Sequence, residues 1–139
     1  MMRRLHLQDV PTKWQTSIDY LEAWLEQVVQ EEALAIRKLT YRFISDEEML
    51  EENKRLLDHD YFTDIITYGE VVRGRINGDI IVSHDRIRDN AMLLNKSEIE
   101  ERDRVLVHGL LHLCGYGDKT KEEELKMREL EDKYLLLRP

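Results

Sequence analysis

The sequence predicts an α+β fold, in which one small mixed sheet of about four strands packs against about five helices. Three observations predict it. Apolar residues recur at three- and four-residue spacing in some segments, short alternating or β-branched runs occur in others, and the 139-residue length is that of one domain. The segments follow the order β-α-β-α-β-β-α-α-α, so the helices cover a single sheet. We therefore expect residues 1–139 to form a single domain.

The first half of the chain has clear helix and strand patterns. Residues 17–31 carry apolar side chains at the spacing of an amphipathic helix: Ile18, Leu21, Leu25 and Val28. Apolar and polar residues then alternate over 38–43, which predicts a half-buried strand. Ser45 and Glu48 form a capping-box pattern that predicts the start of a second helix. The apolar face of this helix is Met49, Leu50, Leu56 and Leu57.

The second half contains a predicted hairpin and two long helices. Two runs rich in β-branched residues, 65–72 and 80–82, are separated by Gly74 and the pair Asn77-Gly78, which predicts a hairpin. Two more capping-box patterns, Ser97 with Glu100 and Thr120 with Glu123, predict helices over about 98–114 and 121–136.

Composition excludes several classes of protein. With 36% charged and 42% apolar residues, the chain has enough apolar content for a core and is neither disordered nor collagen-like. No apolar run approaches the ~18 residues that span a bilayer. The single cysteine, Cys114, cannot form an internal disulfide, which is typical of a reducing compartment. We expect a cytoplasmic protein with no membrane partner.

The formal net charge of −8 argues against a nucleic-acid partner, because phosphate contacts need Lys and Arg. The excess is concentrated in residues 45–70, which carry nine acidic and two basic side chains. The remainder is near neutral and leaves a basic face possible. Its most basic stretch holds Arg73, Arg75, Arg86 and Arg88. We expect no DNA partner.

The candidate chemistry lies in the predicted helix that ends near Cys114. His108 and His112 are four residues apart in an otherwise apolar stretch, so both imidazoles lie on one face, at the spacing with which two ring nitrogens bind one metal ion. Gly115 can end the helix in a left-handed cap, and Gly117 allows a tight reversal. Asp118 would then arrive as a third ligand. The sequence thus predicts a metal site at the end of a buried central helix.

A histidine pair at this spacing can also be a pair of hydrogen-bonded core residues. Two facts favour metal: burial of two imidazoles without partners is costly, and Asp118 supplies a third donor. Cys114 is about 200° around the helix from His112 and is expected to be a core residue. His6, His59 and His84 have no ligand spacing and are expected at the surface or at caps.

Position 109 excludes one metal chemistry. Metalloproteases with the H-E-x-x-H motif carry a glutamate general base directly after the first histidine, whereas this chain has Gly109. A peptidase mechanism of that type is therefore not encoded on this helix.

Residues 108–116, His-Gly-Leu-Leu-His-Leu-Cys-Gly-Tyr, resemble the H-G-x-L-H-L-x-G-Y-D-H signature of the YbeY family of bacterial endoribonucleases. Upstream, residues 63–68 and 78–83 are similar to its P-T-D-V-L-S-F and G-D-I-V-I-S strands. Downstream, residues 122–127 are similar to its E-E-x-x-M helix. The segments occur in family order over about residues 53–130.

The resemblance implies a zinc-dependent, single-strand-specific endoribonuclease that acts in 16S rRNA 3′-end maturation and ribosome quality control, with rRNA and the small ribosomal subunit as partners. It implies His108 and His112 as metal ligands. Asp118 stands where the family has its third histidine, and Gly117 where the family has Asp. Leu57 stands at the position of a family arginine, whose charge Arg55 or Arg73 could replace.

Two alternatives stay open. The first is a non-catalytic ribosome-assembly binding factor with a structural or weak metal site, and the second is a metal-dependent hydrolase of another substrate. The sequence does not identify the nucleophile, which is either a water or the RNA 2′-hydroxyl, or a general base. It does not give the oligomeric state.

Overall fold

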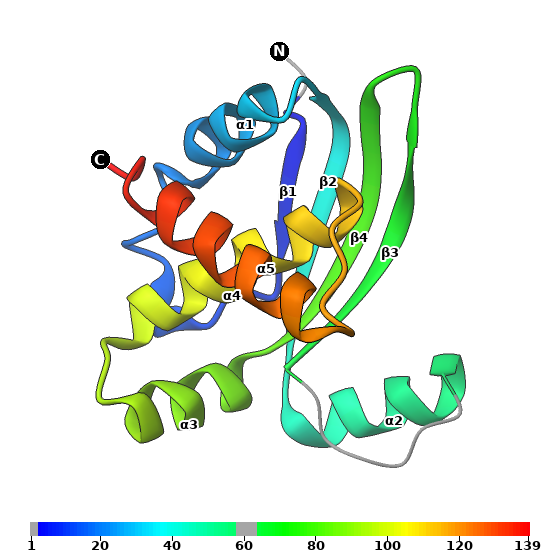
Figure 1. The fold of residues 1–139 in the computed structure, drawn as a ribbon. Helices are drawn as coiled ribbons and strands as arrows, with labels where there is room; N and C mark the ends of the chain where they lie inside the picture. Colours follow the sequence, from blue (N-terminus) through cyan, green and yellow to red (C-terminus); the bar gives the residue numbers. More distant parts are fainter. Residues whose placement is uncertain (1–2, 58–63) are drawn as a thin grey trace.

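The computed structural model describes residues 3–57 and 64–139, and Figure 1 shows their fold. The strands are β1 (Leu5–Gln8), β2 (Ala35–Ile44), β3 (Ile65–Val72) and β4 (Arg75–Ser83). The helices are α1 (Leu21–Glu31), α2 (Asp46–Leu57), α3 (His84–Leu94), α4 (Glu98–Leu113) and α5 (Lys121–Leu135), with a short 3-10 turn at Thr12–Trp14. His59, expected at the surface or at a cap, lies outside the described residues.

The described strands form one sheet in the order β1-β2-β4-β3. β1, β2 and β4 are parallel neighbours, and β3 pairs antiparallel with β4 as a hairpin. The sheet is therefore mixed, and the predicted α+β class with four strands and five helices is confirmed over the described residues. No helix in this part of the chain is long and apolar enough to cross a membrane.

Different helices pack against the two faces of the sheet. α1, α4 and α5 gather on one side, and their apolar residues share one buried cluster with alternate residues of β2 and β4, such as Ile76 and Ile80. α2 lies apart from these helices (Figure 1) and buries Met49 against Ile66 and Ile81 of the other face. Because successive strand residues point to opposite faces, β4 contributes Ile80 to one cluster and Ile81 to the other.

Most predicted helix ends match the structure. Ser45 and Glu48 make the expected capping contacts, and Thr120 and Glu123 form a reciprocal capping box. In the predicted capping box of Ser97 and Glu100, the Ser97 hydroxyl accepts a hydrogen bond from the Glu100 N–H at 3.0 Å. The predicted helix over 17–31 begins four residues later than expected, at Leu21.

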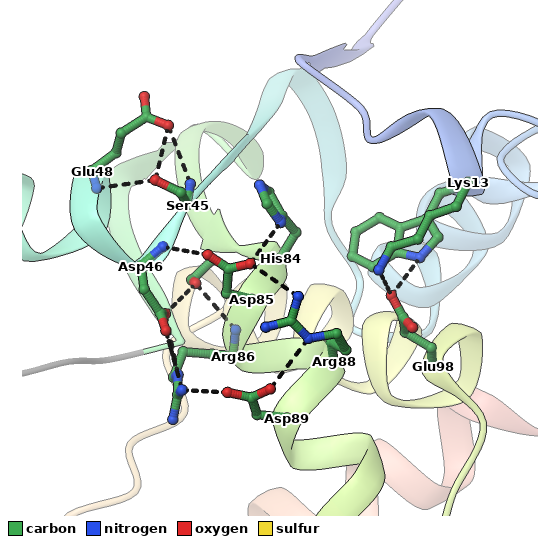
Figure 2. Close-up of polar contacts among 12 residues, drawn as sticks. Lys13, Ser45, Asp46, Glu48, His84, Asp85, Arg86, Arg88, Asp89 and Glu98 are labelled. Atoms are coloured by element: carbon green, nitrogen blue, oxygen red, sulfur yellow. Dashed lines mark hydrogen bonds and ion pairs between the residues drawn. The ribbon is translucent and has the colours of Figure 1, made fainter.

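Side-chain contacts join the N-termini of α2 and α3, which lie about 39 residues apart in sequence (Figure 2). The Asp85 carboxylate accepts from the Asp46 backbone N–H at 2.9 Å, while the Asp46 carboxylate accepts from Arg86 Nε at 3.1 Å. Asp89 pairs with both Arg86 and Arg88. Arg86 and Arg88, two of the four arginines of the most basic stretch, are thus ion-paired to carboxylates and do not form a free basic face.

The β3-β4 turn lies at Gly74, one of the two predicted turn positions, and not at Asn77-Gly78. Arg73 and Gly74 occupy the turn with φ of 53° and 75°, the two positive values that a tight hairpin turn needs. Gly78, predicted in the turn, lies inside β4 opposite Gly69 of β3. A Cβ at Gly78 would lie 2.4 Å from Leu113 Cδ1, and one at Gly69 2.8 Å from Leu113 Cδ2. The two glycines form a hollow that lets the end of α4 approach the sheet.

We predict that Gly78→Ala lowers the free energy of unfolding by about 1–3 kcal/mol, because the added methyl group overpacks against Leu113. In a Leu113→Ala background the same change should be neutral or stabilising, since the clashing atoms are gone and alanine is favoured over glycine within a strand. Urea unfolding of the two single variants and the double variant gives the coupling energy. Additive effects of the two substitutions would contradict the glycine hollow.

Candidate metal centre

α4 brings the two predicted histidines together. His108 and His112 lie one turn apart, with ring centroids 4.5 Å apart and Nε2 atoms 3.0 Å apart. Their side chains are 23% and 26% exposed, so the pair lies at the rim of the core and is open on one side. The six residues 105–107 and 109–111 around them are buried, as expected for a helix packed on most of its circumference.

The loop after α4 carries Asp118 to the same point. Gly115 has a φ of 109° and donates its N–H to the His112 carbonyl, while the Tyr116 N–H bonds to the Leu111 carbonyl at 3.1 Å. The expected left-handed helix end is therefore present. Asp118 Oδ2 lies 3.4 Å from His108 Nε2 and 3.3 Å from His112 Nε2.

Gly117 differs from expectation in its role. Its φ is not positive, and a Cβ at this position would lie 2.7 Å from Glu123 Oε2. Glu123 is held in place because its carboxylate accepts the N–H groups of Lys119 and Thr120. Gly117 therefore leaves room for the Glu123 carboxylate where the loop passes α5.

Both imidazoles present a lone pair to the centre. His108 Nδ1 lies 2.6 Å from Glu131 Oε2, and His112 Nδ1 lies 2.9 Å from the Tyr116 carbonyl oxygen. A carboxylate and a carbonyl only accept, so both Nδ1 atoms carry the proton and both Nε2 atoms of the neutral rings are bare. Two lone pairs and the Asp118 carboxylate thus face one another, an arrangement that repels unless a positive charge lies between them.

The dimensions of the cluster fit a metal ion. Its three edges of 3.0, 3.3 and 3.4 Å compare with about 3.3 Å between ligand atoms that bind tetrahedral zinc at ~2.0–2.1 Å. A proton can bridge one of these edges, whereas a divalent cation satisfies all three donors. Within the described residues, these three side chains form the one group of potential ligand atoms close enough to hold an ion.

Glu131 of α5 completes the support of His108, and the sequence analysis did not identify it. It is buried, and its other oxygen accepts from Arg104 at 2.9 Å. Burial lowers the pKa of His108, but the hydrogen bond and charge of Glu131 outweigh it and raise that pKa above 6.5. Burial likewise raises the pKa of Glu131, and its bonds from His108 and Arg104 outweigh it, so this pKa lies below 4.5. Glu131 is therefore ionised and holds the His108 proton on Nδ1.

Asp64, just before β3, adds another carboxyl group near the centre. Burial raises the pKa of Asp64 above 3.8, an effect that nearby His108 partly offsets. Asp64 and His108 line a pocket of about 250 Å³ that also contains Lys96 and Arg128. The cluster thus borders a space with both acidic and basic side chains.

Gly109 shows why a zincin-type glutamate is missing from this helix. A Cβ at Gly109 would lie 2.6 Å from Ile65 Cδ1 and 3.2 Å from two atoms of Ile80. The position is the contact between α4 and the β3-β4 hairpin. A glutamate there would be forced into the helix-sheet interface and could not face the cluster of His108, His112 and Asp118.

The remaining candidates of the sequence analysis have structural roles or separate locations. Cys114 is half-buried against the core, and burial together with Glu32 raises its pKa to about 12, which makes it unreactive. His6 is exposed on β1, and His84 contacts Asp85 at 3.5 Å. Neither lies with the metal-binding group.

The two arginines considered as replacements at Leu57 occupy different places. Arg55 lines a groove of about 340 Å³ on the α2 side of the sheet, together with Lys38, Arg42 and Tyr68. Arg73 lies in the β3-β4 turn and lines another hollow. Arg55 is therefore the one that lies beside other cations, although Glu52 pairs with it at 2.6 Å and with Arg42 at 3.4 Å, and Asp79 lines the same groove.

Comparison with known proteins gives consistent matches. The family model described as Endoribonuclease YbeY matches residues 6–137. A curated protein named Endoribonuclease YbeY from Cytophaga hutchinsonii is 49% identical over 119 residues, covering 85% of this chain and 83% of the relative. That of Porphyromonas gingivalis strain W83 is 41% identical over 114 residues, covering 82% and 76%. The solution structure of TM1509 from Thermotoga maritima matches with a TM-score of 0.67 and 26% identity, over 98% of this chain and 88% of that one.

We predict that Glu131→Gln lowers the pKa of His108 in the metal-free protein, because a neutral amide does not stabilise the imidazolium. A folded-state pKa above the unfolded value of about 6.5 means that the ion pair stabilises the fold below that pH and that this contribution is lost as pH rises through the folded-state pKa. NMR titration of the imidazole in the presence of a chelator measures both effects. Glu129→Gln, a change at an exposed position of the same helix, is the matched control. Equal His108 titrations in both variants would rule out the assigned role of Glu131.

Proposed function

Since this chain belongs to the family of YbeY endoribonucleases, we propose that it is a zinc-dependent enzyme that cleaves single-stranded RNA, in the cytoplasm, during 16S rRNA 3′-end maturation and ribosome quality control. Its partners are then rRNA and the small ribosomal subunit. One observation supports the metal dependence of this activity. Three potential ligand atoms, from His108, His112 and Asp118, lie within 4.8 Å of one another.

The donor set fits a catalytic rather than a closed site. Three protein ligands leave a fourth position for a water or a phosphate oxygen, whereas structural zinc sites fill all four positions with protein ligands. The Asp118 side chain is 42% exposed, so the cluster faces solvent on the side where RNA would approach. A zinc ion bound here supplies Lewis-acid charge to the phosphodiester.

The side chains around the site prepare it for this task. Glu131 and the Tyr116 carbonyl keep the imidazole protons on Nδ1, which leaves both Nε2 atoms free to ligate. The negative charge of Asp118 would offset part of the charge of the cation. It would therefore strengthen binding of the ion and weaken its action as a Lewis acid. The raised pKa of Asp64 makes this carboxyl a candidate to transfer a proton near the phosphodiester.

The substrate must be bound by positive charge elsewhere, because carboxylates surround the metal ligands. The groove with Lys38, Arg42 and Arg55 is the candidate for the phosphate backbone, and Tyr68 offers a ring beside it. We propose that Arg55 takes over part of the task of the family arginine that is replaced by Leu57. The alternatives, a binding factor without catalysis and a hydrolase of another substrate, remain distinguishable by experiment.

We predict that the purified chain binds about one zinc ion and that His112→Ala, or the double alanine variant at 108 and 112, loses both the ion and cleavage of single-stranded RNA. Elemental analysis and a gel assay with a fluorescent RNA measure these two properties. His6→Ala, which removes an exposed histidine of β1, is the matched control and should retain both. Circular dichroism establishes that each variant is folded.

Three outcomes would each point elsewhere. Unchanged metal content in the double variant would exclude the site. Zinc binding and RNA binding without cleavage would favour the ribosome-assembly binding factor. Bound zinc without any interaction with RNA would favour a hydrolase of another substrate.

We predict that Asp118→Asn weakens zinc binding, because an amide oxygen is a poorer zinc donor than a carboxylate, while Asp118→His retains the ion. The histidine variant removes one negative charge from the site, so it should cleave RNA at least as fast as the unmodified chain when the ring fits. Competition with a chelator gives the affinities. Unaltered affinity in Asp118→Asn would show that this carboxylate does not bind the ion.

A further inference from the structure

A second cluster lies behind the metal centre, where α1 ends. Glu32 directly follows α1, and its two carboxylate oxygens accept from two tyrosines. Tyr116 donates to Oε1 at 2.6 Å, and Tyr134 donates to Oε2. The carboxylate thus joins the end of α1 to the loop between α4 and α5, 84 residues away in sequence, and to α5, 102 residues away.

Glu32 is itself held firmly. The end of α1 is closed by the Leu34 N–H, which bonds to the Val29 carbonyl at 2.8 Å, and by Ala33 in the left-handed region with a φ of 60°. On the other side, the backbone carbonyl of Tyr134 accepts from Trp24 Nε1 at 2.8 Å, and the Trp24 side chain is buried. Backbone and side-chain hydrogen bonds thus hold both the end of α1, where Glu32 lies, and the part of α5 that carries Tyr134.

A single residue, Tyr116, connects this cluster to the metal centre. Tyr116 binds Glu32 through its hydroxyl and accepts the His112 Nδ1 proton through its carbonyl oxygen at 2.9 Å. The orientation of that carbonyl decides which nitrogen of His112 carries the proton and where the ring plane points. Any rotation of the peptide at Tyr116 would turn the carbonyl away from the ring.

The chain around Tyr116 needs an external anchor. Glycines flank it on both sides, and Gly115 adopts a φ of 109° that most residues avoid. Backbone bonds fix the start of the loop to α4, and Glu123 fixes its end at Lys119 and Thr120. Between these two points the Tyr116 hydroxyl bonds to Glu32, and Asp118 contacts the two histidines.

We propose that Glu32 is a positioning residue of the metal centre, which acts through Tyr116 to hold the carbonyl group that orients the His112 imidazole. The inference rests on the proposed metal-dependent function and assigns to it a residue far from the ligands in sequence. Tyr134 shares the same carboxylate but belongs to α5, and its backbone carbonyl bonds to Trp24 and not to a histidine, so it is expected to contribute to the stability of the fold and not to the metal affinity.

The two tyrosines provide a matched pair for the test. Tyr116→Phe and Tyr134→Phe each remove one hydroxyl from the same carboxylate and keep the ring, and Glu32→Ala removes the acceptor. Zinc affinity of the full chain is measured by competition with a chelating dye, and the stability of the metal-free chain by urea unfolding. Nitrogen NMR of the metal-free chain reports which ring nitrogen of His112 is protonated.

We expect Tyr116→Phe and Glu32→Ala to weaken zinc binding about tenfold or more and Tyr134→Phe to change it by less than about twofold, the first figure being typical of lost support of a metal-binding histidine. His112 should keep its Nδ1 proton in the unmodified chain and in Tyr134→Phe and become a mixture of tautomers in the other two. Both tyrosine variants should lose similar stability.

The inference is overturned if Tyr116→Phe keeps the affinity and the tautomer, or if Tyr134→Phe weakens zinc as much, since the cluster would then act by packing alone. In either case zinc binding by the unmodified chain, and its loss in His112→Ala, would leave the proposed function in place. Absence of zinc binding by the unmodified chain would overturn both.

Discussion

The structure depends on the burial of α4, a helix that must pack on most of its surface and still turn two imidazoles to one side. Its first turns carry a fully buried ion pair, Arg102 with Asp103, which Ser17, Tyr20 and Arg138 satisfy. A buried pair adds little net stability, but loss of one partner costs about 3–5 kcal/mol, so it strongly disfavours any other rotation of the helix. Gly109 sets the contact with β3 and β4, and Leu113 enters the hollow between two strand glycines. These three contacts along one helix fix its rotation and its distance from the sheet, and the direction of His108 and His112 follows.

Electrostatics then determines what the end of α4 can bind. The carboxyl groups of Asp118, Glu131 and Asp64 lie around His108 and His112, so acidic side chains are the immediate neighbours of the imidazole pair. A divalent cation bound here would place positive charge where, in the proposed function, the phosphodiester approaches. The affinity for RNA at this point would then depend on the metal, while the groove with Lys38 and Arg42 would hold the rest of the strand. The overall charge of −8 is compatible with an RNA substrate because the two tasks lie on different surfaces.

What the sequence could predict was local. Capping boxes at Ser45 and Thr120 located helix starts, the four-residue spacing of His108 and His112 put both rings on one face, and the glycine after Cys114 ended the helix. The residues that sequence patterns missed act over long separations. Glu131 supports His108 from 23 residues away, and Glu32 reaches Tyr116 across 84. Gly78 was read as a turn residue because glycine after asparagine is a hairpin signal, whereas its task is to make room for Leu113, a contact that no local pattern contains.

The two departures from the YbeY signature at the end of the loop are coupled by geometry. An aspartate is shorter than the histidine that usually stands at position 118, so its backbone must come closer to the metal ligands for Oδ2 to reach a position 3.3 Å from His112 Nε2. Closer approach brings position 117 against the carboxylate of Glu123, whose Oε1 accepts two backbone N–H groups. A side chain at 117 would meet that carboxylate at 2.7 Å, and an aspartate there would add like-charge repulsion. Glycine removes both obstacles. The absence of a side chain at Gly117 thus fits the shorter side chain at Asp118, which in the proposed function takes the place of the third histidine.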